Sequence, residues 1–338
     1  MMKQIFLFLL LTMPLGLMAQ DMPLVASANE SYSNVSAISV EGEFCKVDVR
    51  RGEAITLKAE LRAAKELEGY GVQTTQEAGV LKVVITKPES GWTSHAGFVN
   101  LTVAEGLPVT INTTSGYITL DGLAGGDIKA QSKSGKINAA NITANTALTS
   151  RSASIKAENI KGELKMKSKG GSQIARNIEG ATSFYTSSGA MTVEGVNGAL
   201  TTESTDGEQV IKNIKGDIYL KTKSGAVKLS DSQGSIGLLS ASGTLNLFNV
   251  EGVFNLVATK GSIIGTRVKL SESSTFNTTE GKIKLKFVNP KEQFTFACQS
   301  DHAYIVAYGK SKKKKLKMGD GPIVVTAIST TGAMNFNK

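Results

Sequence analysis

Short runs in which apolar and polar residues alternate recur through the middle of the chain, and each run follows a small residue, usually glycine. Ile118 and Leu120 are the second and fourth residues after one such glycine, and Leu245 and Leu247 after another. Alternation with a period of two predicts a short β-strand with one buried face. The small residues keep a spacing of 18 residues, and this anchor column consists of Gly135, Ala153, Gly171, Gly189, Gly207, Gly225, Gly243 and Gly261.

A second glycine column lies halfway between the anchors and consists of Gly162, Gly180, Gly198, Gly216, Gly234 and Gly252. Two strands and two turns therefore fill each 18-residue unit, which is typical of one coil of a parallel β-solenoid. The glycines are expected at turns whose backbone conformation is closed to residues with a Cβ atom. The sequence thus predicts an all-β protein with stacked 18-residue coils.

Two polar columns follow the same period. One consists of Asn141, Asn159, Asn177, Asn213, Asp231 and Asn249, with Gly195 in its gap. Stacked amides are expected to hydrogen-bond along the rod. The other consists of Ser132, Ser150, Ser168, Thr186, Ser204, Thr222 and Ser240. These hydroxyls are expected to close buried turns, and a serine repeated in this way indicates a ladder rather than a nucleophile.

The flanks of the repeat break its period. No proline occurs between Pro108 and Pro290, as expected where every strand is paired on both sides. We therefore predict an N-terminal β-rich cap over residues 20–108, solenoid repeats over 109–289, and C-terminal closing coils over 290–338 with a basic loop at 309–321. Cys45 and Cys298 fall near opposite ends, so they are predicted to be buried, unlinked thiols.

Residues 1–19 have the pattern of a secretory signal peptide, with Lys3 before an apolar stretch and Ala19 at the expected cleavage site. No second apolar run is long enough to span a membrane. We expect an exported protein without a transmembrane span, located in the periplasm, on the outer surface or outside the cell.

The net charge is +9, from 38 Lys and Arg against 29 Asp and Glu. For an exported chain this favours anionic envelope polysaccharide, lipid headgroups or a surface protein as partner, rather than nucleic acid. Two groups of cations are candidate interaction residues. The first is a column on successive coils, and the second is the lysine run of the predicted loop; together they comprise Lys133, Arg151, Lys169, Lys312, Lys313, Lys314 and Lys315.

No set of residues predicts a catalytic, cofactor-binding or metal site. The two histidines, His95 and His302, lie outside the predicted coils. We therefore predict a non-enzymatic, adhesin-like interaction module. The alternative is a carbohydrate-active enzyme, a lyase or glycoside hydrolase, which would need paired carboxylates or a metal with a base. The loosely clustered acidic residues that would serve it are Glu203, Asp206, Glu208 and Asp217.

The segment "FVNLTVAEGLPVTINTTSGYITLDGLAGGDIKAQSKSGKINAANI" resembles the entry of the bacterial adhesin-like β-helix proteins of unknown function (DUF4097 and DUF2807, or head GIN, type). The segment "GDGPIVVTAISTTGAMNF" resembles their terminal coil, so that the resemblance covers about residues 30–338. It implies a right-handed parallel β-helix that is exported or attached to the envelope. It carries over no catalytic or binding residue, and the basic segment 309–321 departs from the family pattern.

Overall fold

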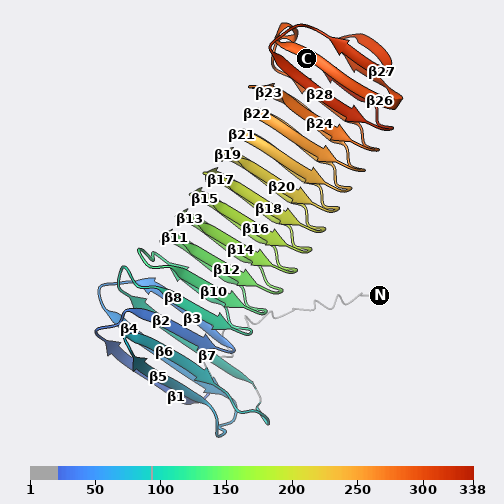
Figure 1. Ribbon diagram of the computed structural model, residues 1–338. Helices are drawn as coiled ribbons and strands as arrows, with labels where there is room; N and C mark the ends of the chain where they lie inside the picture. Colours follow the sequence, from blue (N-terminus) through green and yellow to red (C-terminus); the bar gives the residue numbers. More distant parts are fainter. Residues whose placement is uncertain (1–21, 93) are drawn as a thin grey trace, which may run out of the picture.

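The computed structural model describes residues 22–92 and 94–338, so the predicted signal peptide lies outside the described residues. The chain forms a long rod of parallel coils with a β-rich cap at each end (Figure 1). Apart from strands and turns, these described residues contain one short 3-10 helix, η1 (Lys291–Gln293). Within the described residues no helix is long and apolar enough to cross a membrane.

The coils present two faces to solvent. The strands of the first face are β8 (Val109–Thr113), β10 (Ile128–Ser132), β12 (Thr146–Ser150), β14 (Leu164–Ser168), β16 (Thr182–Thr186), β18 (Leu200–Ser204), β20 (Ile218–Thr222) and β24 (Ser274–Thr278). Those of the second face are β9 (Ile118–Asp121), β11 (Ile137–Thr143), β13 (Ile155–Lys161), β15 (Gln173–Glu179), β17 (Met191–Asn197), β19 (Gln209–Lys215), β23 (Ile263–Leu270) and β25 (Ile283–Phe287). The long strands β21 (Val227–Ser240) and β22 (Leu245–Ala258) contribute to both faces.

Each strand pairs in parallel with its equivalent in the next coil. Ile137 of β11 lies opposite Ile155 of β13, and Leu164 of β14 lies opposite Thr182 of β16, both 18 residues further along. In-register stacking places the inward residues of successive coils above one another, so the interior is a set of mainly aliphatic columns sealed from solvent, with buried polar side chains such as Gln173 and Gln209 among them. The predicted parallel β-solenoid with 18-residue coils is confirmed.

At the N-terminal end the stack begins before residue 109. The strands there are β1 (Leu24–Tyr32), β2 (Ala37–Gly42), β3 (Cys45–Arg51), β4 (Ile55–Ala63), β5 (Gly71–Glu77), β6 (Val80–Thr86) and β7 (His95–Val103). β2 and β3 pair in parallel with β8 and β9, so they already form a coil. On their other edges, β2 pairs in parallel with β6, and β3 pairs in parallel with β7. β5 then pairs antiparallel with β6, and β4 pairs antiparallel with β7.

The C-terminal end is closed by a similar reversal of the chain. Its strands are β26 (Phe294–Ala307), β27 (Lys310–Met318), β28 (Ile323–Ser329) and β29 (Met334–Asn337). β28 and β29 come last in the sequence but lie between the coil of β24 and β25 and the outer strand β26. β27 then runs antiparallel along β26. The predicted basic loop 309–321 is therefore wrong: most of it is a strand, because Leu316 packs into the core and Met318 is half-buried.

The anchor glycines are required for a reason other than the predicted one. Gly225 does not have a positive φ, so its backbone is open to other residues. A Cβ there would lie 2.8 Å from the carbonyl carbon of Gly207, one coil earlier, and closer still to its oxygen. Close approach between coils therefore disfavours a side chain at Gly225. The second glycine column does have positive φ, as at Gly216 (+142°), so the predicted reason holds there.

The hydroxyl column closes the anchor turns as predicted. Ser132 Oγ accepts the N–H of Gly135 at 2.8 Å, and Ser240 Oγ donates to the carbonyl of Gly243 at 2.9 Å. The hydroxyl of Ser168 also donates to that of Thr186 in the next coil, at 3.0 Å. These side chains are almost completely buried, so each turn is closed inside the rod without an unpaired hydroxyl.

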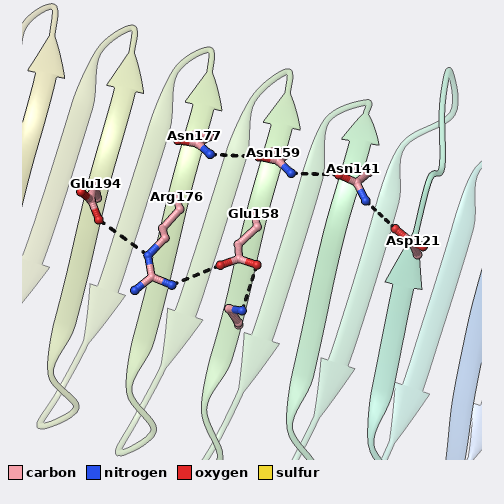
Figure 2. A network of polar contacts seen from close by, with 8 residues as sticks. Asp121, Asn141, Glu158, Asn159, Arg176, Asn177 and Glu194 are labelled. Atoms are coloured by element: carbon pink, nitrogen blue, oxygen red, sulfur yellow. Dashed lines mark hydrogen bonds and ion pairs between the residues drawn. The ribbon is translucent and has the colours of Figure 1, made fainter.

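The amide column also forms a ladder (Figure 2). Asn177 Nδ2 donates to Asn159 Oδ1 at 3.1 Å, Asn159 to Asn141 at 2.9 Å, and Asn141 to Asp121 at 2.9 Å. Asn159 has φ of +55°, a left-handed conformation that asparagine tolerates better than most residues. The column therefore combines a backbone requirement with a side-chain bond between coils.

Cys45 and Cys298 are free, buried thiols in strands at opposite ends of the rod (Figure 1). Burial raises the pKa of each thiol to about 12.

We expect iodoacetamide at pH 8 to leave both thiols unmodified in the folded protein and to modify both after unfolding, with intact mass as the measurement. Because the folded pKa is raised, the neutral thiols stabilise the fold below their ordinary pKa, and this stabilisation is lost as pH rises toward 12. An intramolecular disulfide in the unfolded, unreduced chain would contradict the placement.

Candidate functional site

The cation column Lys133, Arg151 and Lys169 lies directly beyond the ends of β10, β12 and β14, where the hydroxyl ladder turns the chain. The backbone N–H of Arg151 donates to the carbonyl of Ser132 at 3.1 Å, and that of Lys169 donates to the carbonyl of Arg151 at 3.2 Å. These bonds hold the three residues one coil apart, and all three side chains are exposed. The predicted stacking of this column is therefore present.

The column lines a groove of about 480 Å³. Outward residues of β10, β12, β14 and β16 line it as well: Gln131, Thr149, Lys167 and Tyr185. A further hollow of about 740 Å³ shares Gln131 and Lys133 and continues toward the N-terminal cap, where Glu41, Glu43 and Glu89 also line it. The groove therefore follows the rod axis across several coils, a shape that suits an extended chain.

Lys167 and Tyr185 are members of the groove that the sequence analysis did not identify. Lys167 Nζ lies 5.4 Å from the centre of the Tyr185 ring, within cation–π range, and Tyr185 as a residue is 39% exposed. Both residues occupy the outward position two residues before the cation column, so a search of the 18-residue period at that offset would have found them. They add a fourth cation and an exposed aromatic ring.

The groove cations differ from many others on the shaft in having no carboxylate beside them. Elsewhere the stack pairs opposite charges, as in Arg176 with Glu158 (3.2 Å) and with Glu194 (3.7 Å) (Figure 2). Hydrogen bonds from Lys156 and Arg176 lower the pKa of Glu158. Within residues 22–92 and 94–338, by contrast, no carboxylate lies within 4.0 Å of Lys133, Arg151, Lys167 or Lys169. The groove is thus an unneutralised basic surface.

The other four predicted residues, Lys312 to Lys315, lie on β27 at the C-terminal end of the rod. All four are exposed. The structure thus divides the predicted cations into a groove on the shaft and a cluster at the end.

The acidic residues of the enzyme alternative occupy exposed or half-exposed positions. Glu203 pairs with Lys221 (2.8 Å), Glu208 pairs with Lys228 (2.7 Å), and Asp206 accepts a hydrogen bond from the hydroxyl of Ser224. His95 and His302 lie in β7 and β26, at opposite ends of the rod. In the described part of the chain no three His, Cys, Asp or Glu residues lie close enough to hold a metal ion.

Comparison with solved structures finds low sequence identity. A candidate cell adhesion protein from Clostridium sporogenes is 12% identical, with 92% of this chain and 99% of that chain covered and a TM-score of 0.21. A candidate adhesin from Parabacteroides merdae is 14% identical, with 78% of this chain and 92% of that chain covered and a TM-score of 0.25. A search of curated proteins finds no match.

The family model described as Toastrack DUF4097 matches residues 45–233 and, in a second match, residues 183–333. The two matches overlap and span nearly all of the coils, as expected for a family defined by its repeat. The DUF4097 resemblance seen in the sequence is confirmed, and the chain belongs to the Toastrack DUF4097 family.

Proposed function

We propose that this protein is an exported, non-enzymatic, adhesin-like interaction module whose basic groove binds an anionic envelope polysaccharide. The observation that carries the proposal is the row of unneutralised cations, Lys133, Arg151, Lys167 and Lys169, on three successive coils. Their spacing of one coil, about 4.8 Å, repeats along the axis as the charges of a linear polyanion do.

The rest of the groove supports a sugar ligand. Gln131 and Thr149 offer an amide and a hydroxyl between the cations, and Tyr185 offers an exposed ring face. Polar groups that fix orientation, combined with an aromatic surface, are typical of small-molecule and glycan recognition. Export is inferred from the signal-peptide pattern of residues 1–19.

The test compares the chain beginning at Gln20 with the groove variant Lys133→Gln/Arg151→Gln/Lys169→Gln. Polygalacturonate serves as the acidic probe and dextran as the neutral one, with affinity measured by calorimetry. Three exposed charge contacts of about 0.5 kcal/mol each predict a roughly tenfold loss for polygalacturonate. Added salt is expected to weaken wild-type binding. The matched control Lys312→Gln/Lys313→Gln/Lys315→Gln removes the same charge from the end of the rod and should retain the affinity.

Equal binding of dextran and polygalacturonate, or equal losses in the two triple variants, would contradict the groove assignment. Turnover of either glycan that Asp206→Asn abolishes would favour the carbohydrate-active enzyme instead.

A further inference from the structure

The positive charge of the protein is concentrated at one end. Residues 282–338 contain 11 of the 38 Lys and Arg but only 3 of the 29 Asp and Glu, a net charge of +8 out of the chain's +9. Residues 22–108 contain 8 cations and 11 carboxylates, a net charge of −3. Because these segments form opposite ends of the rod, the molecule is electrically polarised along its axis (Figure 1).

The centre of this charge is β27, the outermost strand of the C-terminal end. Its described pairing is with β26 alone, so its other edge carries no neighbouring strand. Six exposed lysines lie along it: Lys310, Lys312, Lys313, Lys314, Lys315 and Lys317. In the described part of the chain no carboxylate lies within 4.0 Å of any of them.

Protection of a free strand edge explains some of these lysines but not their number. Lysines and irregular pairing discourage the addition of another strand, and the register between β26 and β27 shifts around Lys314, whose φ is +73°. The edge strands of the opposite end, β1 and β5, contain no lysine or arginine. A side-chain hydrogen bond joins these two strands instead, from the hydroxyl of Thr74 in β5 to the carboxylate of Glu30 in β1, at 3.1 Å. The fold therefore ends a sheet without a lysine run when only the edge must be protected.

The lysines of β27 lie along the outermost strand of the C-terminal end, beside both faces of the rod. Lys313 lies across from Tyr304 on the second face, and Lys315 lies across from Gln299 on the first face. Tyr304 is 60% exposed beside the cations, and tyrosine is a residue that favours the interface between water and lipid. A cluster of four to eight lysines next to such a residue is the arrangement that recognises an anionic membrane surface.

We propose that the C-terminal end of the rod docks on an anionic phospholipid surface through the lysines of β27. The polarised charge orients the molecule, with the net negative N-terminal cap pointing away from the surface. This site is separate from the groove and does not depend on the polysaccharide proposal.

The test measures partition of the chain beginning at Gln20 onto vesicles by sedimentation. One vesicle contains equal parts of phosphatidylcholine and phosphatidylglycerol, and the other contains phosphatidylcholine alone. The wild type should bind the first and not the second, and salt should release it. The end variant Lys312→Gln/Lys313→Gln/Lys315→Gln, which leaves Lys314 and its positive φ in place, should lose about 100-fold in partition coefficient.

The groove variant Lys133→Gln/Arg151→Gln/Lys169→Gln is the matched control, because it removes the same charge and should stay within about threefold of wild type. Melting temperatures close to wild type are expected for both variants, since all the replaced side chains are exposed. Binding without preference for phosphatidylglycerol, or equal losses in the two variants, would overturn the proposal. So would polygalacturonate binding that the end variant abolishes while the vesicles stay unbound, because the end would then be a polysaccharide site.

Discussion

Gly225→Val is expected to lower the free energy of unfolding by about 3 kcal/mol or more. The new Cβ would lie 2.8 Å from the carbonyl carbon of Gly207 and closer to its oxygen, so the two coils would have to separate. Separation would weaken the parallel ladder on both sides of the turn, where the N–H of Ser224 donates to the carbonyl of Thr205 at 2.9 Å. Urea unfolding followed by circular dichroism measures the loss.

Two variants control this experiment. Lys223→Ala, two residues away with an exposed side chain, should change stability by less than about 0.5 kcal/mol. Gly225→Ala should fall between the two, because Ala153 shows that one coil of the anchor column accommodates a single methyl group. If valine and alanine are equally harmless at position 225, close approach between coils is not what selects glycine.

Phe296→Ala is expected to cost about 3–5 kcal/mol. Phe296 is completely buried in β26, with its ring centre 5.5 Å from those of Phe294 and Phe336 and 5.9 Å from that of Tyr308. These rings fill the interior of the C-terminal end, where the aliphatic columns of the shaft stop. Removing the central ring leaves a cavity that the surrounding strands, fixed by their ladders, cannot fill.

Thermal unfolding and hydrogen exchange together test this prediction. We expect amides of β26 to β29 to lose protection first, because each coil of a solenoid contacts only its neighbours. Ile328→Ala on the adjacent strand β28 is the control, since that side chain is 48% exposed. Similar losses for the two variants would show that the aromatic cluster does not close the end.

The strand pairing of the shaft could be predicted because its information is local and repeated. A small residue every 18 positions, followed by apolar residues such as Leu245 and Leu247, specifies the same strand and turn in every coil. Since parallel stacking puts residue i opposite residue i+18, the ladders of Asn159 and Ser168 follow directly from the period. A coil whose own pattern is weak can still be assigned, because the coils before and after it fix its position in the 18-residue period.

The groove could be predicted only in part, for a related reason. The cations of Lys133, Arg151 and Lys169 occupy one column and were visible as such. Lys167 and Tyr185 belong to a second outward column, two residues before the turn, and the structure shows that both columns line the same groove. A groove joins two columns, whereas periodicity describes each column separately.

The sequence by itself determined the 18-residue coil and the positions of its buried residues, because these depend on contacts between equivalent residues at one constant separation. The same repeated pattern also identified the family. The tertiary structure alone decided how the ends are built. It showed that β28 and β29 pair with β26, and that the lysine run forms the strand β27. It also showed that Gly225 is required because of the nearby carbonyl of Gly207, not because of its own φ. These features depend on which strand edge remains free after the others have paired, and on distances between segments that share no local pattern.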